Sequence, residues 1–234
     1  MTHPEQTAGQ QMPQQTPQNE AAGTVLAEAR EAIRREAAGV LAVADQLDDT
    51  FLQAARWLFD CTGMVFVTGA GTSGAIARRM AHLFSVCGTP SVHLPGADAL
   101  HGTMGAVRDG DIVVAISRGG GSREINDLTT RVQARGARVI ALTAAPESEL
   151  GTLADLVVTL TSPLGVDPGE VIAMGSTLVT AAWGDALALV LMRLRGYGWE
   201  QVLHSHPSGA VGQLHEAPDA LPPLTLDAPA GAGR

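Results

Sequence analysis

The chain has 234 residues, a formal net charge of −9 and a hydrophobic fraction of 45%. That length predicts one domain with terminal tails, and the acidic balance argues against nucleic acid and anionic membranes as main partners, because both require a basic face. Every one of the 15 Lys and Arg residues is an arginine, so mechanisms that need a lysine, such as a Schiff base or a P-loop, are excluded.

The predicted domain lies between two tails. Residues 1–21 and 215–234 contain few large apolar side chains, so we expect a disordered N-terminal tail and a flexible C-terminal tail. Residues 22–214 carry the patterns of a folded domain. Within it, apolar residues at helical spacing predict helix over 24–59, which the turn formers from Asp48 onward can divide into two helices.

Short apolar runs then alternate with turns and helical segments. The runs are continuously apolar, which is typical of parallel strands covered on both faces. The fold class predicted is therefore α/β, a three-layer α/β/α sandwich with a five-stranded parallel sheet. The predicted strands are 64–67, 91–94, 112–116, 139–142 and 156–160. Helices are expected after the glycine-rich turn at 69–74, ending at about 86, and also over 123–135, near 148–154 and over 172–195.

The remaining gross features indicate a cytoplasmic protein. Cys61 and Cys87 are isolated thiols, and the N-terminus is polar and lacks a signal-peptide pattern, which predicts reduced thiols. The apolar stretch around 178–194 is interrupted by Gly184 and Asp185. We therefore expect a buried helix there and no membrane span.

The first turn of interest is Gly69-Ala-Gly-Thr-Ser-Gly74, between a predicted strand and a helix. Its glycines allow close backbone approach, and the helix N-terminus favours an anion. The same spacing occurs in dinucleotide-binding folds, but the acidic residue expected about 20 residues on is absent from Ser91-Val-His-Leu-Pro95. The other alternative is a glycine turn that serves packing alone and binds no ligand. The candidate binding residues are Gly71, Thr72 and Ser73.

The second turn follows the third predicted strand. Glycine amides, two hydroxyls and an arginine are typical of an oxyanion site, although Arg118 and Arg123 can equally be solvated surface charges. Because the carboxyl ends of parallel strands share one edge, both turns together indicate a phosphorylated ligand. The candidate residues are Ser117, Arg118, Gly119, Gly120, Gly121 and Ser122.

Glu124 lies in the first turn of the next helix, where it is either a helix-dipole carboxylate or a general base beside a bound sugar. His101, His204 and His206 are further candidates. Their spacing is not diagnostic of a metal site, and no G-x-S-x-G elbow supports a hydrolase triad. We expect no metal and no cofactor.

These motifs resemble the sugar isomerase (SIS) domain family, most closely its arabinose-5-phosphate isomerase group. The resemblance runs in family order over about 24–214. The motifs that carry it are Val67-Thr-Gly-Ala-Gly-Thr-Ser-Gly74, Gly88-Thr-Pro90, Ala99-Leu-His-Gly102, Ala115-Ile-Ser-Arg-Gly-Gly-Gly-Ser-Arg-Glu-Ile125, Pro163-Leu-Gly165, Gly184-Asp-Ala-Leu-Ala188 and Ser205-His-Pro-Ser-Gly-Ala-Val-Gly212.

The resemblance implies the flavodoxin-like SIS fold without the CBS domains that most bacterial members carry. It implies a small phosphorylated sugar as ligand, and a homodimer or homotetramer with sites shared between subunits. Residues 117–122 resemble the family's phosphate cradle. Glu124 matches a candidate base, His101 matches a site histidine, and His206 matches a histidine thought to reach a neighbouring subunit's site.

The chain departs from the family pattern at several positions. Thr72 stands where the family has Lys, Gly121 stands where it has Glu, and no Glu precedes Pro163. We hypothesise that Arg118 supplies the charge lost at residue 72. We expect Glu170, in an inserted stretch, to replace the missing carboxylate, with Ser176 and Thr177 nearby as binding residues.

Two functions follow from these observations. The first is a phosphosugar aldose–ketose isomerase that acts through an enediol, with Glu124, His206, His101 and Glu170 as catalytic residues. The alternative is a sugar-phosphate-binding protein without isomerase activity that acts as a sensor or partner. The substituted lysine and the displaced glutamate favour the alternative, whereas the retained Glu124 and histidines favour the enzyme.

Overall fold

The computed structural model describes residues 17–214 and 216–226. Its centre is a five-stranded sheet in the order β2-β1-β3-β4-β5, in which all neighbouring strands are parallel. This confirms the predicted α/β sandwich with a flavodoxin-like strand order. The strands are β1 (Val65–Gly69), β2 (Ser91–His93), β3 (Ile112–Ile116), β4 (Arg138–Thr143) and β5 (Leu156–Thr159).

Helices cover both faces of the sheet, because alternate strand residues point to opposite faces and both sets are apolar. Val67, Val114 and Leu142 point into a core shared with α2, α3 and α7, whereas Phe66 and Val113 pack under α4, α5 and α6. The first group is α2 (Asp49–Asp60), α3 (Gly71–Val86) and α7 (Gly175–Leu194), and the second is α4 (Gly96–Leu100), α5 (Arg123–Gln133) and α6 (Glu149–Leu153).

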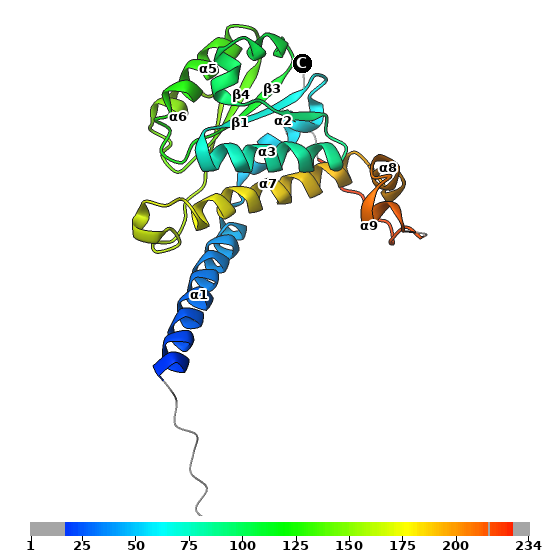
Figure 1. Ribbon diagram of the computed structural model, residues 1–234. Coiled ribbons are helices and arrows are strands. Elements are labelled where there is room, and N and C mark those ends of the chain that lie inside the picture. Colours follow the sequence, from blue (N-terminus) through cyan, green and yellow to red (C-terminus); the bar gives the residue numbers. More distant parts are fainter. Residues whose placement is uncertain (1–16, 215, 227–234) are drawn as a thin grey trace, which may run out of the picture.

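Helix α7 lies across α2 and α3 as an additional layer (Figure 1). By length and composition it is apolar enough to cross a membrane. Its inner face is nevertheless packed in the core. Trp183 is buried, and its ring meets Phe51 of α2 edge-on at a centroid distance of 5.7 Å. The expected buried helix is therefore present.

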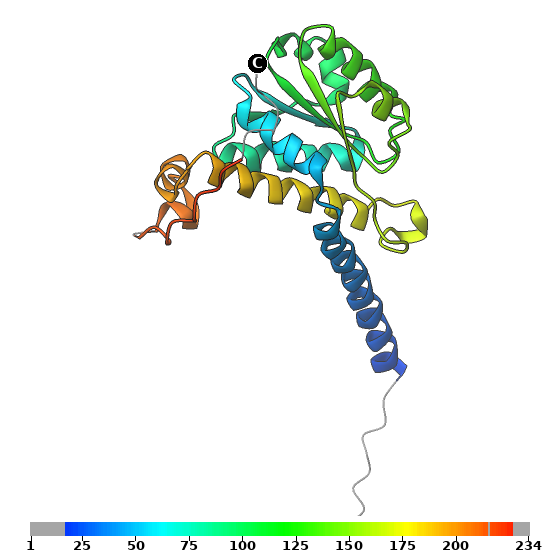
Figure 2. The same cartoon turned by 180° about the vertical axis from the view of Figure 1, so that it is seen from behind.

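Helix α1 (Pro17–Ala42) projects away from this body (Figures 1 and 2). Its C-terminal end is packed, where Gly39 faces Val166 and Val179. Leu26 and Ile33 on the projecting part are exposed. Short helices complete the chain: η1 (Ala44–Gln46), η2 (Thr103–Ala106), η3 (Pro168–Glu170), α8 (Trp199–Ser205) and α9 (Gly209–Gly212).

The described residues reach beyond 22–214 at both ends. Helix α1 begins at Pro17, inside the N-terminal stretch expected to be disordered. Within residues 216–226, the Pro222 carbonyl accepts a hydrogen bond from Arg193 Nε of α7 at 2.7 Å, and the Asp219 carbonyl accepts one from Trp199 Nε1, at the start of α8, at 2.9 Å. The predictions for residues 1–16, 215 and 227–234 lie outside the described residues.

The expected break in the first helical stretch is confirmed, with Asp48 as the N-cap of α2. Its carboxylate accepts hydrogen bonds from the Thr50 amide at 2.8 Å and from the Thr50 hydroxyl at 2.6 Å. These bonds lower the pKa of Asp48, because they favour its ionised form. The cap satisfies a backbone donor that the first turn of a helix leaves without a partner.

Replacing this cap tests its contribution to stability. We expect Asp48→Ala to lower the free energy of unfolding by about 1 kcal/mol, because the Thr50 amide loses its acceptor. Asp48→Asn is the matched control and should stay close to wild type, since an amide oxygen also caps well. Urea unfolding followed by circular dichroism measures both. Equal losses in the two variants would contradict the capping role.

Candidate functional site

The two glycine-rich turns lie side by side at one edge of the sheet. Strands β1 and β3 are neighbours in parallel register, with Gly69 opposite Ile116 at their carboxyl ends. The chain passes from β1 to β2 on one side of β1 and then crosses to β3 on its other side, so the direction of strand order reverses at β1. In open parallel sheets this is the point where a crevice forms and ligands bind.

The first turn brings the start of α3 close to the end of β1. A Cβ on Gly69 would lie 2.8 Å from the Ser73 carbonyl carbon, so only glycine permits this approach. Gly71 has a φ of 56°, in the left-handed region that glycine favours. The first amides of a helix lack intrahelical acceptors, which here places unpaired donors at the predicted positions Gly71, Thr72 and Ser73.

The second turn is anchored to β4 and α6. The buried Ser117 donates its amide hydrogen to the Leu142 carbonyl at 3.1 Å, and its hydroxyl lies 3.3 Å from that of Ser122. Gly120 has a φ of 64°, and a Cβ there would overlap the Ser148 side chain. Gly119 and Gly121, by contrast, have open space around them. The turn is thus fixed at its base and open at its outer residues.

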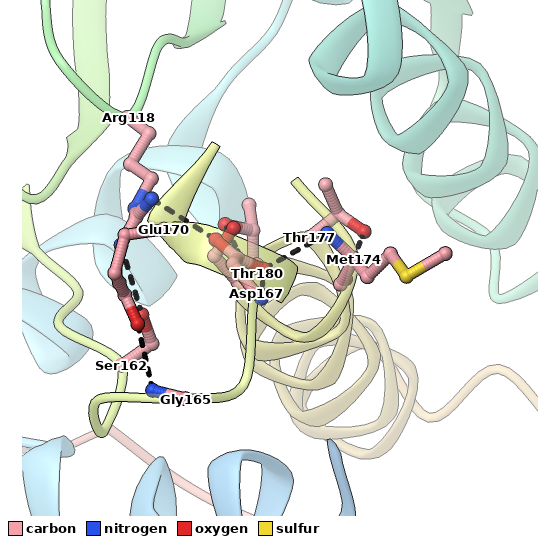
Figure 3. Close-up of polar contacts among 9 residues, drawn as sticks. Arg118, Ser162, Gly165, Asp167, Glu170, Met174, Thr177 and Thr180 are labelled. Atoms are coloured by element: carbon pink, nitrogen blue, oxygen red, sulfur yellow. Dashed lines mark hydrogen bonds and ion pairs between the residues drawn. The ribbon is translucent and has the colours of Figure 1, made fainter. Parts of the chain in front are cut away.

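Arg118 extends from this turn toward α7 (Figure 3). Its Nη1 lies 2.9 Å from Asp167 Oδ2, and its Nη2 lies 3.7 Å from Glu170 Oε2 and 3.4 Å from the Ser162 hydroxyl. The Arg118 side chain is 43% exposed. It also lines a small pocket, so the structure brings together four residues predicted to bind phosphate or another part of the substrate: Ser73, Arg118, Ser176 and Thr177.

Asp167 is the site residue that the sequence analysis missed. Its side chain is fully buried, and its Oδ1 accepts hydrogen bonds from the amides of Met174 at 2.8 Å and Ser176 at 3.0 Å, where α7 begins. Burial by itself would raise the pKa of Asp167, but hydrogen bonds from Ser176 and Met174 and the Arg118 charge outweigh it and lower that pKa. Asp167 is therefore held as a carboxylate. The only signal in the sequence is an acid shortly before a helix start.

Glu170 contacts Arg118 rather than the region around Glu124. Its Oε1 accepts a hydrogen bond from the Gly165 amide at 2.7 Å, within its own loop. Its φ of 56° is unusual for a residue other than glycine, and its side chain is 42% exposed. In this arrangement Glu170 is a partial counter-charge for the guanidinium.

Glu124 and His101 lie on the α4–α5 side of the same edge. Glu124 is half-buried at the start of α5, and its Cγ lies 3.8 Å from the point where a Cβ on Gly96 would be. His101 is exposed directly after α4, which packs against α5. Arg123, between the second turn and Glu124, is exposed and has no ion-pair partner among residues 17–214 and 216–226.

His206 lies far from these residues within one chain. It follows α8, and its Nδ1 lies 2.7 Å from the Val202 carbonyl. Helix α7 has 20 residues, and a helix of that length spans about 30 Å. Asp167 binds the start of α7, whereas α8 lies beyond its other end (Figure 1). His204, in α8, also lies at that end. Across the part of the chain that the structure describes, no three His, Cys, Asp or Glu side chains form a group suited to a metal ion.

Comparisons with known proteins identify related sequences and a related fold. Residues 58–190 match the family model of the SIS domain. The chain is 33% identical over 192 residues to the arabinose 5-phosphate isomerase GutQ of Escherichia coli K12, covering 79% of this chain and 60% of that protein. It is 35% identical over 184 residues to the arabinose 5-phosphate isomerase KdsD of Salmonella typhi, covering 79% and 56%. The chain thus spans at most 60% of the length of these curated relatives.

A solved structure is also similar to this chain. An Escherichia coli CFT073 protein in complex with arabinose 5-phosphate superposes with a TM-score of 0.76 at 30% identity, covering 79% of this chain and 98% of that one.

A pair of glycine substitutions tests how the second turn is fixed. We expect Gly120→Ala to lower the free energy of unfolding by more than about 1 kcal/mol, because the left-handed backbone and the contact with Ser148 both exclude a Cβ. Gly121→Ala, next in the same turn, meets nothing within 4 Å and should stay close to wild type. Thermal unfolding compares them, and a stable Gly120→Ala protein would show that this turn tolerates another conformation.

Proposed function

We infer that this chain, which belongs to the SIS domain family, is a phosphosugar aldose–ketose isomerase that acts through an enediol intermediate. The observation that carries the proposal is the meeting, at one sheet edge, of two amide-rich turns with Arg118 on one side and Glu124 on the other. The curated relatives are named as arabinose 5-phosphate isomerases. Arabinose 5-phosphate is therefore the first substrate to test.

The phosphate group is proposed to bind between the turns. The free amides at the start of α3 and the hydroxyls of Ser117 and Ser122 are donors, and Arg118 adds a positive charge. This supports the hypothesis that Arg118 replaces the charge that the family places at residue 72. Ser176 and Thr177 close the site from α7.

In the proposed reaction one hydrogen moves from C2 to C1 and another from the C2 oxygen to the C1 oxygen, so that the carbonyl group shifts from C1 to C2. Glu124 removes the proton from C2 of the open-chain aldose, the electrons form the C1–C2 double bond, and the carbonyl oxygen at C1 gains a proton to give the enediol. Return of a proton to C1 and loss of one from the C2 hydroxyl give the ketose. Nearby amides stabilise the negative oxygen that develops. Reactant and product are isomers, so the sequence of steps balances without an oxidant or reductant.

Opening of the sugar ring is assigned to histidine. His101 lies near the Glu124 side of the edge, and His206 is proposed to come from a neighbouring subunit. The long separation of His206 from Arg118 within one chain supports a homodimer or homotetramer with shared sites. The exposed apolar residues of the projecting helix α1, Val25, Leu26, Ile33 and Leu41, also favour assembly. We place this enzyme in the cytoplasm.

Two observations favour a second function, sugar-phosphate binding without turnover. Arg118 faces two carboxylates, and residue 72 is Thr. Assays of isomerisation over pentose and hexose phosphates, beginning with arabinose 5-phosphate, distinguish the two functions when combined with thermal-shift binding. Turnover supports the isomerase, whereas binding of these sugars without turnover supports the binding protein.

Replacing the proposed base tests the mechanism. We expect Glu124→Gln to lower kcat by about 10²–10⁴-fold with little change in substrate binding, because an amide cannot accept the C2 proton. Asp127→Asn, at an exposed position of the same helix, is the matched control and should keep wild-type turnover. Steady-state kinetics and substrate titration measure both. A Glu124→Gln enzyme with wild-type kcat would overturn the assignment.

Mixed oligomers test whether sites are shared. Glu124→Gln and His206→Asn are each expected to be inactive alone. In a randomly mixed dimer of the two variants, about a quarter of the sites would contain both original residues, because each site takes one residue from each subunit. Activity should therefore recover after co-expression. Co-expression of Glu124→Gln with the double variant is the control and should recover none. Absence of recovery in the first mixture would contradict sharing through these residues.

A further inference from the structure

The contact between Arg118 and Asp167 joins two distant parts of the chain. Arg118 belongs to the turn after β3, and Asp167 belongs to the loop that leads into α7. The pair is short, with Nη1 2.9 Å from Oδ2, and its carboxylate is fully buried while the guanidinium remains 43% exposed (Figure 3). The arginine is thus held by a short ion pair at Nη1, whereas Nη2 makes longer contacts with Ser162 and Glu170 on the more exposed side.

Burial of a carboxylate is costly unless its charge is well compensated. In Asp167 the charge is compensated at Oδ1, which accepts hydrogen bonds from the amides of Met174 and Ser176. Both amides belong to the start of α7, where the helix dipole also favours a negative charge. Since the backbone already compensates much of the Asp167 charge, the Arg118 charge is not fully neutralised by this partner.

We propose that Asp167 is a positioning residue that holds the Arg118 guanidinium over the pocket lined by Ser73, Ser176 and Thr177, so that it meets the substrate phosphate there. This inference rests on the proposed phosphosugar function. An arginine side chain has several rotatable bonds, and fixing it beforehand reduces the entropy lost when the ligand binds. The planar guanidinium can bind Asp167 at one nitrogen and a phosphate oxygen at another.

Glu170, in contrast to Asp167, competes with the substrate phosphate for Arg118 in this arrangement. Its contact with Arg118 is longer, at 3.7 Å, and its side chain is 42% exposed, so the interaction is weak. Glu170 already binds the Gly165 amide in its own loop. An incoming phosphate competes with Glu170 for Nη2, whereas the buried Asp167 keeps Nη1. Loss of the two carboxylates should therefore change phosphate affinity in opposite directions.

A double-mutant cycle tests this role. Dissociation constants for inorganic phosphate and arabinose 5-phosphate are measured by calorimetry for wild type, Asp167→Asn, Arg118→Ala and the double variant. We expect Arg118→Ala to weaken binding by about 10–100-fold, as for a lost hydrogen bond to a charged group. Asp167→Asn should weaken it by about 5–20-fold in the wild-type background and have no further effect when residue 118 is Ala.

The comparison variant is Glu170→Gln, which should bind phosphate more tightly than wild type, because a competitor for Arg118 is removed. In kinetics, Asp167→Asn should raise KM with kcat nearly unchanged, which a general loss of folded structure would not do. Arg118→Lys covers the case in which Asp167→Asn does not fold. Its single ammonium keeps the charge but not the two-nitrogen geometry, so its affinity should fall close to that of Arg118→Ala.

The outcomes separate this inference from the proposed function. If wild type binds neither phosphate ligand, the proposed function fails and this inference fails with it. If wild type binds but Asp167→Asn binds equally well, or loses affinity to the same extent with Ala at residue 118, only the positioning role is overturned. Wild-type affinity in Arg118→Lys would also overturn it.

Discussion

The parallel register of β1 and β3 is the constraint on which the site depends. Parallel strands end at the same edge, and every following helix begins there, so two turns with unpaired amides necessarily meet at the carboxyl ends of these strands. The glycines inside the turns permit the close approach that this meeting requires, most clearly at Gly69 and Gly120. An anionic ligand is the chemical complement of such an edge.

The helix α7 completes this edge from outside the sheet. It lies across α2 and α3, and the loop before it returns to the turn after β3 through the contact of Asp167 with Arg118. This contact places one positive charge among backbone donors in a chain that has no lysine. The balance between a buried carboxylate, an exposed one and a single guanidinium is therefore the main electrostatic feature of the proposed phosphate site.

The groups proposed for proton transfer are divided in space. Glu124, in the first turn of α5, and His101, directly after α4, lie on one side of the edge, while His206 follows α8 at the far end of α7. A single subunit thus brings the proposed phosphate site and the proposed base to one edge but keeps His206 remote from them. The projecting α1 and its exposed apolar residues also support the proposed assembly of subunits.

Local patterns in the chain were enough to predict the sheet, its parallel direction, the helix break at Asp48 and the two turns, because apolar periodicity and glycine spacing can be read over a few neighbouring residues. They also indicated Ser73, Arg118, Ser176 and Thr177, which the structure brings to one pocket. They did not reveal that Asp167 is buried and paired with Arg118, or that Glu170 lies beside this arginine and not beside Glu124. Those positions depend on how the loop before α7 packs on a turn that is distant in sequence, and such long-range packing leaves no periodic signal in the chain.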